Sequence, residues 1–204
     1  MKKKYVYIIN IVIPIIILIG SLIHFEVAPF GKYSIGICDA ITQFKPMLFD
    51  FVTKLKLGIF SVYSFNNGFG NPIIFNIMYY LNSPINIIAI LFNNSDSMFF
   101  AVILIKMIIA SLAMTFYTYT KTDRSDVVVI STLSYVFSSW FLIYYYNFFW
   151  LDLFMIFPIF QYGLELILED KKPFIYILSL GYMIFSNFFL IPNKTRPIKC
   201  DLKK

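Results

Sequence analysis

Long runs of apolar residues alternate along this chain with short polar connectors and with one long loop of mixed character. The runs cover residues 5–23, 97–120, 126–147, 151–168 and 173–191. Each is close to the roughly 20 residues that an α-helix needs to cross the hydrocarbon core of a bilayer. The pattern therefore predicts an all-α polytopic membrane protein with about five transmembrane helices.

The first apolar run is preceded by Lys2, Lys3 and Lys4. A cleaved signal peptide has a shorter apolar region, of roughly 7–15 residues, followed by a cleavage site between small residues. The sequence has neither feature, so residues 1–25 are expected to form an uncleaved signal-anchor helix with its amino terminus inside the cell. Pro14 falls within this helix and predicts a modest kink.

The loop after the first helix, residues 26–97, is far longer than an ordinary connection of about 2–8 residues. Over residues 37–57 its apolar residues recur at helical spacing with charged residues between them, which predicts an amphipathic helix on the membrane surface. Two glycines within 68–70 predict a turn. Two shorter helices are expected over residues 72–81 and 84–92, each beginning at a proline.

Composition and charge agree with a membrane protein. Hydrophobic residues make up 59% of the chain, charged residues only 14%, and the mean hydropathy is +0.76. The net charge of +6 comes from cations at the ends of the apolar runs. Cations in these positions set the orientation of membrane helices. Nucleic acid is therefore not expected as a partner. The connectors that hold Lys121, Arg124, Lys171 and Lys172 are expected in the cytoplasm with the amino terminus, which makes the long loop extracellular.

The final segment, residues 192–204, departs from this charge pattern. It carries five cations and would lie outside, where short tails are normally poor in Lys and Arg. The residues before it, 98–191, are expected to hold transmembrane helices 2–5. Either the fifth run is a hairpin or re-entrant segment, or residues 192–204 are an aberrant basic tail that results from truncation or a frameshift, and we favour the second interpretation.

Asp39 is the main candidate for chemistry. It lies near the start of the predicted surface helix, just outside the membrane, with Gln43 one turn later on the same face. A carboxylate there could act as the general base for an acceptor hydroxyl, or it could hold a divalent cation against a phosphate. The alternative is a solvated residue that caps the helix. His24 is the only histidine, which excludes a histidine metal site and a Ser–His catalytic pair.

Three ionisable residues interrupt the apolar runs. Asp152 falls at the outer end of the fourth run, where the free-energy cost of an acid in the membrane indicates a functional role. The alternative is structural, because a carboxylate in the first turn of a helix is stabilised by the helix dipole. Lys106 lies deep in the second run, where it could face the bundle interior and pair with an acidic group. Glu165 is expected to reach the cytoplasmic end of its helix.

Tyr79, Tyr80 and Asn71 are the candidate sugar ligands of the loop. Tyrosine rings stack on sugars, but they are equally typical of the aromatic belt at a membrane interface. The Asn71 amide could bind a sugar hydroxyl, although asparagine is also a common turn residue. These alternatives stay open at the level of the residues.

Four segments occur in a fixed order: GICDAITQFKPML, SFNNGFGNPIIFNIMYYLNSPINIIAILF, TFYTYTK and LSYVFSSWFLIYYYNFFWLDLFMIFPIFQYGLELIL. Together they make residues 30–187 resemble the amino-terminal part of the bacterial YfhO membrane-protein family, which is similar to type-C glycosyltransferases. The resemblance implies a multi-pass protein of the bacterial cytoplasmic membrane. It also implies transfer of a sugar from a polyprenyl-phosphate donor to a cell-envelope polymer of the teichoic-acid type.

The resemblance further implies roles for individual residues. Asp39 would be the catalytic base or a metal-linked residue, so a divalent metal ion is the candidate cofactor. The substrate-binding candidates are Gln43, Asn71, Tyr79, Tyr80 and Asp152. Family members are several times longer, so the chain is expected to be a fragment that lacks later helices, and the isolated fragment is expected to be inactive.

Two alternatives come from other functional classes. A transporter or flippase component for a lipid-linked solute would line a path through the membrane with polar residues deep in its spans. A non-catalytic envelope assembly protein would have no need of Asp39.

Overall fold

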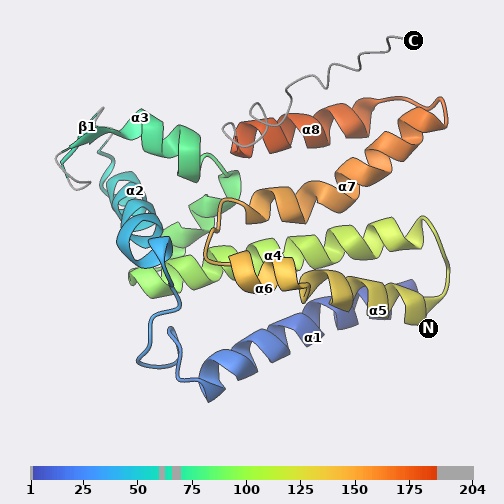
Figure 1. The fold of residues 1–204 in the computed structure, drawn as a ribbon, viewed down its shortest axis with the longest axis horizontal. Helices are drawn as coiled ribbons and strands as arrows, with labels where there is room; N and C mark the ends of the chain where they lie inside the picture. Colours follow the sequence, from blue (N-terminus) through green and yellow to red (C-terminus); the bar gives the residue numbers. More distant parts are fainter. Residues whose placement is uncertain (1, 60–62, 66–69, 188–204) are drawn as a thin grey trace, which may run out of the picture.

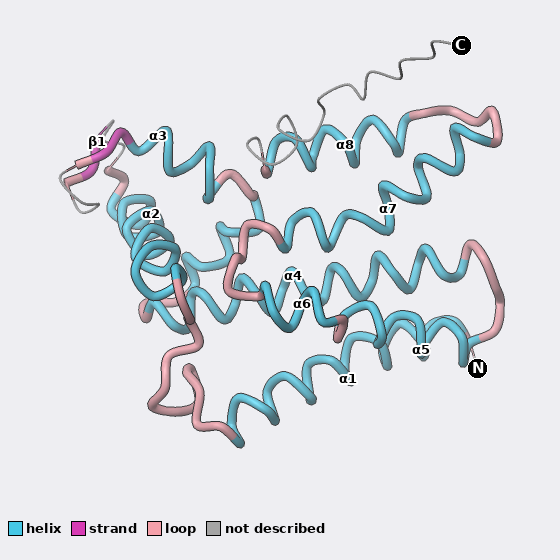
Figure 2. Tube along the Cα trace, viewed as in Figure 1, coloured by secondary structure: helices cyan, strands magenta, loops and turns pink. Residues whose placement is uncertain are grey.

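The computed structural model describes residues 2–59, 63–65 and 70–187, which are mostly helical (Figures 1 and 2). The helices that lie lengthwise in Figure 1 are α1 (Lys3–His24), α4 (Ser95–Tyr119), α5 (Ser125–Val136), α6 (Ser139–Tyr144), α7 (Leu151–Leu168) and α8 (Phe174–Ser186). The loop between α1 and α4 forms a lobe at one end. The all-α prediction is confirmed.

Helix α4 is the centre of the bundle. It packs against α1, α5 and α7, and its outer part also contacts two helices of the loop lobe. Its side chains are apolar nearly all round, which is the pattern of a helix buried on every side, and Phe99, Val102 and Met107 have no exposed surface. Helices α1, α5 and α7 and two loop helices are therefore positioned relative to α4, while α8 packs on α7.

Polar contacts fix the directions of the neighbouring helices. Lys3, at the start of α1, forms an ion pair of 3.0 Å with Asp123, just after α4, and Asn10 Nδ2 donates to Thr115 Oγ1 at 2.8 Å. The two helices are therefore antiparallel. The amino terminus, the α4–α5 connector and the α7–α8 connector lie at the same end of the bundle (Figure 1).

Four helical segments are long and apolar enough to cross a membrane: Lys3–His24, Ser95–Tyr119, Ser125–Tyr144 and Leu151–Leu168. A bent pair of loop helices would make a fifth if it were one span. The predicted third span is broken after Val136, between α5 and α6. In the predicted fifth span, the described part holds α8, which has 13 residues and is shorter than a full crossing, and residues 188–191 lie outside the described part.

The loop contains the three predicted helices in modified form. The surface helix begins as a π-helix, Ala40–Phe44, and continues as α2 (Lys45–Leu57). The second is α3 (Ile73–Asn76), which runs into a π-helix, Ile77–Leu81. The third, Pro84–Leu91, is a 3-10 helix. The second and third are bent by 102° relative to each other, and we call them the bent pair.

A short antiparallel ladder joins α2 to the bent pair. Strand β1 (Tyr63–Ser64) pairs with β2 (Asn71–Pro72). Gly70 precedes β2 with a φ of 105°, and a Cβ at this position would meet the Tyr63 ring at 2.3 Å. The positive φ strongly favours glycine here, and any side chain would also displace the Tyr63 ring. The predicted glycine turn has its other glycine, Gly68, outside the described residues.

Candidate functional site

Asp39 lies on the exposed surface of the loop lobe. It is the residue before the π-helix Ala40–Phe44, and its side chain makes no capping hydrogen bond. In the described part of the chain it has no ion pair or side-chain hydrogen bond. Its neighbour Cys38 is also exposed and has a φ of 48°. The carboxylate is thus free to meet a solute.

Gln43 and Tyr80 are brought together from distant parts of the loop. The Gln43 side-chain amide donates to the Tyr80 hydroxyl at 3.2 Å, and both residues are half-buried. Tyr79 packs beside Tyr80 with ring centroids 5.9 Å apart and is 41% exposed. Three of the predicted substrate-binding residues therefore form one cluster. The Asn71 backbone lies in β2, but its side chain lies outside the described part of the structure.

An aromatic layer separates this surface from the bundle interior. Phe44 contacts Tyr80, Phe148 and Phe149, with ring centroids 5.0–6.4 Å apart. Tyr80 also meets Phe149 edge-on at 5.1 Å. Phe148 is fully buried, whereas Tyr80 is half-buried and faces the layer from the loop side. Such edge-to-face packing holds each ring in a defined place.

Asp152 lies on the other side of this layer, in an interior ion pair. Its Oδ2 accepts a hydrogen bond from Lys106 Nζ at 2.6 Å, and both side chains are 0% exposed. Lys106 also donates to the Phe148 carbonyl at 2.9 Å and lies 5.1 Å from the centre of the Phe148 ring. The sequence-based expectation that Lys106 pairs with an acid in the bundle interior is confirmed.

Two hydroxyl groups complete the surroundings of the Asp152 carboxylate. Its Oδ1 accepts from Ser83 Oγ at 2.5 Å and from Tyr182 at 2.7 Å. Ser83 lies at the break of the bent pair, and Tyr182 lies on α8. Four elements therefore meet at one carboxylate, and we call Lys106, Asp152, Ser83 and Tyr182 the buried hub. Three of the carboxylate's roughly four acceptor positions are occupied by groups of the protein. A substrate-binding role for Asp152 stays a prediction.

Sequence reasoning had missed Ser83 and Tyr182 as hub residues. A serine before Pro84 is a common helix cap, and a tyrosine in an apolar run is a common membrane residue, so neither was distinctive. Nearby, Asn86 is fully buried and both its side-chain polar atoms lack a partner among the described residues. The Asn86 backbone N–H donates to the Ser83 carbonyl at 3.1 Å, so Asn86 lies one turn after the break.

A second polar network fastens the surface helix to the bundle. Lys45, in the first turn of α2, pairs with Asp96 in the first turn of α4. Ser34 accepts from Lys45 Nζ at 2.7 Å and donates to Asp96 at 3.0 Å. The side chains of Lys45 and Asp96 are 10% and 24% exposed, so water screens this pair only partly. The lobe is thereby fixed on the end of α4.

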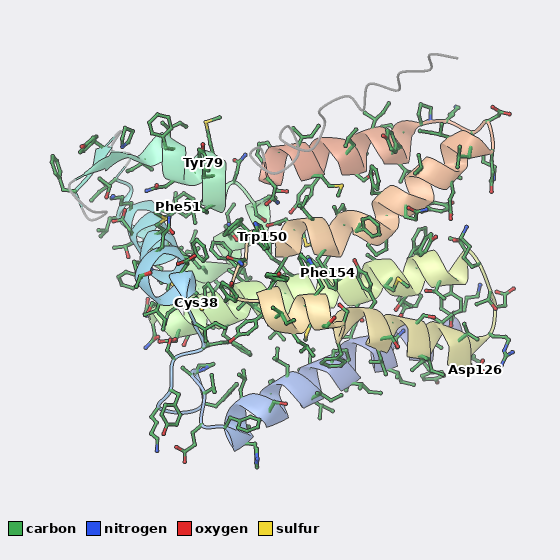
Figure 3. All side chains as sticks on the ribbon, in the orientation of Figure 1. Cys38, Phe51, Tyr79, Asp126, Trp150 and Phe154 are labelled. Atoms are coloured by element: carbon green, nitrogen blue, oxygen red, sulfur yellow. The ribbon has the colours of Figure 1, made fainter. Side chains whose placement is uncertain are left out.

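The opposite end of the bundle carries exposed charge pairs. Glu165 pairs with Lys121 and accepts from the Tyr117 hydroxyl at 2.9 Å, which agrees with the predicted position at that end. The hydrogen bond to Glu165 raises the pKa of the Lys121 ammonium above its ordinary value. Figure 3 places Asp126 at this end and Cys38 toward the other.

The described part of the chain holds no assembled metal centre. Over the described ranges, no group of three or more His, Cys, Asp and Glu side chains could hold a metal ion. A cation at Asp39 would therefore take its other ligands from a phosphate and water.

These features define a helical membrane protein with an exposed aspartate on the loop lobe at one end and a buried ion pair in the bundle. The family model described as bacterial membrane protein YfhO matches residues 10–190. The chain belongs to this family, which confirms the resemblance found in the sequence. No curated protein and no solved structure matches the chain.

Proposed function

We propose that this chain contributes to a type-C-like membrane glycosyltransferase. The reaction moves a sugar from a polyprenyl-phosphate carrier to a cell-envelope polymer of the teichoic-acid type outside the cytoplasmic membrane. Membership of the YfhO family suggests the enzyme class. The observation that carries the proposal is the exposed Asp39 carboxylate, which has no partner among the described residues and comes four residues before Gln43, whose amide bonds to Tyr80.

The charge distribution supports an extracellular position for Asp39. The amino-terminal lysines, Lys121, Arg124 and the α7–α8 connector share one end of the bundle, and the cation-rich end of a membrane protein faces the cytoplasm. Asp39 belongs to the loop lobe at the other end. A lipid-linked sugar with its tail in the bilayer would present its reacting carbon near this surface.

Asp39 acts in this proposal as the general base. It takes the proton of an acceptor hydroxyl while the hydroxyl oxygen attacks the anomeric carbon and the bond from that carbon to the lipid phosphate breaks. Gln43 and Tyr80 offer an amide and a hydroxyl for sugar hydroxyls. Tyr79 offers a partly exposed ring on which a sugar can stack.

The departing phosphate needs positive charge, and the loop lysines differ in how freely they could supply it. Lys45 is held by Asp96, and Lys54 is held by Asp50, both in partly buried pairs. Lys56 donates to Asn93 at 2.8 Å and to the Phe92 carbonyl. Lys32 pairs with Glu26 at 2.7 Å, with both side chains more than half exposed. Because exposed pairs are weak, Lys32 is the lysine that could most easily exchange its partner for a phosphate.

The decisive experiment replaces Asp39 by Asn in the full-length protein and measures sugar incorporation into the cell envelope. Loss of a general base should lower incorporation by roughly 10²–10⁴-fold. Asp123→Asn is the matched control, because Asp123 is an exposed aspartate at the other end of the bundle. Undiminished incorporation in Asp39→Asn, at equal protein level, would refute the catalytic assignment and favour an assembly role.

The orientation can be tested with a native side chain. In a Cys200→Ser background, Cys38 should react with a membrane-impermeant maleimide applied to intact cells. A variant that also carries Cys38→Ser and Thr122→Cys moves the thiol to the α4–α5 connector and should react only after the cells are opened. The reverse pattern would remove Asp39 from the side where the carrier-linked sugar is used.

The transporter alternative has less support. The polar side chains within the described spans include Asn10, Ser111, Thr115 and Thr132. Asn10 donates to Thr115, Thr115 and Thr132 are 3.1 Å apart, and Ser111 donates to the Asn10 carbonyl. These bonds join α1, α4 and α5 to one another. They act as interhelical contacts, which is a common use of small polar residues in membranes.

A further inference from the structure

We infer that the buried hub is a positioning device: Asp152 and Lys106, through Ser83 and Tyr182, hold the break of the bent pair in place and thereby place Tyr80 against Gln43. The position of Tyr80 relative to Gln43 does not depend on the proposed function. The part that concerns activity rests on the proposed glycosyl transfer.

The bent pair begins and ends on the same side of the membrane. Helices α1 and α4 are antiparallel neighbours, so the end of α1 and the start of α4 lie at the same end of the bundle. The loop between them is fastened there, because Ser34 and Lys45 both contact Asp96 in the first turn of α4. A segment that enters the membrane from one side and returns to the same side is a re-entrant hairpin and not a transmembrane span.

The break of this hairpin reaches down beside α4. Lys106 comes about 11 residues after Ser95, which is roughly 16 Å along the helix axis at 1.5 Å per residue. Ser83 reaches the carboxylate that Lys106 binds, so it lies near this level. Irregular backbone is tolerated at membrane depth only where protein covers it, and Ser83 is 3% exposed.

The polar contacts at the break satisfy this requirement. Ser83 donates to Asp152, and the Asn82 side-chain amide donates to the Phe185 carbonyl at the end of α8 at 2.5 Å. The Asn86 backbone N–H donates to the Ser83 carbonyl at 3.1 Å. Two of these bonds connect the break to α7 and α8, which lie far away in the sequence. The direction of both arms is thereby set by the bundle.

The hub is close in sequence to the exposed site. Tyr80 comes three residues before Ser83, within the π-helix that ends at the break. Its hydroxyl accepts from Gln43, and its ring packs on Phe44 and Phe149. If the break moved, Tyr80 would move with it. Asp152 thus acts on the exposed site as a positioning residue and does not touch substrate.

The test measures the proximity of positions 43 and 80 without any assay of activity. In a Cys38→Ser, Cys200→Ser background, Gln43→Cys and Tyr80→Cys are joined by a short bismaleimide in native membranes, and the initial rate of cross-linking is recorded. The hub is then weakened by Ser83→Ala with Tyr182→Phe. These mild changes remove both hydroxyl hydrogen bonds to Asp152 and the 3.4 Å contact between the two hydroxyls, and they leave the ion pair intact, so the protein should still fold.

The matched control is Ser179→Ala with Tyr135→Phe. It also removes one serine and one tyrosine hydroxyl, but among the described residues Ser179 bonds to carbonyls of its own helix, and Tyr135 bonds to the Phe154 carbonyl, not to the break. We expect the hub variant to cross-link about fivefold more slowly and the control to match the parent. Equal rates in the two variants would overturn the inference.

A second readout separates this inference from the proposed function. In the chain with native residues at 43 and 80, the hub variant should lower the turnover of sugar transfer about fivefold without moving its pH profile, because Asp39 is unchanged. If Asp39→Asn does not affect sugar transfer but the cross-linking still slows, the proposed chemistry fails and the positioning role stands. If cross-linking is unchanged, the positioning role fails whatever the activity.

Discussion

Asp39 and Asp152 carry the same carboxylate in opposite surroundings. Asp39 is exposed and without a partner in the described part of the chain, whereas Asp152 is enclosed and accepts three hydrogen bonds. An exposed carboxylate costs little free energy of folding, because water solvates it, and it is available to a solute. A buried one is stable only if its charge is matched and its oxygens are bonded. The comparison shows that the exposed acid is available to a solute, whereas the buried acid joins helices to one another; the catalytic role of Asp39 is our proposal.

The largest expected effect comes from breaking the buried pair on one side. Asp152→Asn leaves the Lys106 ammonium in the interior without a counter-charge, and loss of one partner of a buried pair costs about 3–5 kcal/mol. Thermal unfolding in detergent and protein abundance should both fall. The double change Lys106→Met with Asp152→Asn should recover most of this loss. Equal stability of the single and double variants would contradict the account, and Asp126→Asn, in an exposed pair, serves as the control.

An intermediate effect is expected at the junction between the loop lobe and the bundle. Lys45→Met removes the partly buried pair with Asp96 and the bond to Ser34, and a hydrogen bond to a charged group contributes about 1.5–3 kcal/mol. The loop should become more sensitive to protease while the bundle stays intact. Lys32→Met, at an exposed pair, is the control and should not change the cleavage rate. The same rate in both variants would show that the pair does not hold the lobe.

A smaller effect of opposite sign is expected at Asn86. Its buried side chain has no partner among the described residues, and an unsatisfied buried group costs about 1–3 kcal/mol. Asn86→Leu removes this cost with a side chain of similar size, so the unfolding temperature should rise. Ile88→Val, a conservative change in the same helix, is the control. A lower unfolding temperature in Asn86→Leu would indicate that the amide binds a group that stabilises the break.

The smallest effect is expected at the exposed acid. Asp39→Asn should change the free energy of unfolding by no more than about 0.5 kcal/mol, because a surface residue without partners contributes little. Thermal unfolding of the variant beside the parent protein checks this. A large loss of stability would mean that Asp39 is structural, and would erase the contrast with Asp152.

The apolar pattern was sufficient to predict the helices. Each long run had the length of a span, and the spacing over residues 37–57 predicted the helix that begins at Ala40. It did not predict the break between α5 and α6 or the 102° bend in the loop. Hydropathy averages over a window, so it cannot detect where a few residues leave helical geometry inside an apolar run.

The sequence also predicted some residues of the candidate site but not the contacts between them. Asp39 and Gln43 were recognisable because they lie one turn apart in an amphipathic segment, and Lys106 because a lysine is costly in an apolar run. That Gln43 binds Tyr80, or that Ser83 and Tyr182 bind Asp152, could not be derived. These pairs are 30 to 69 residues apart, and no local pattern records them.

The sequence by itself determined that this chain is a helical membrane protein of the YfhO family, because apolar length, cation position and ordered motifs are local properties of a chain. The tertiary structure decided which of two similar acids is free and which is enclosed. Burial depends on what other segments cover a side chain, and that is settled only when α4, α7, α8 and the bent pair have packed together.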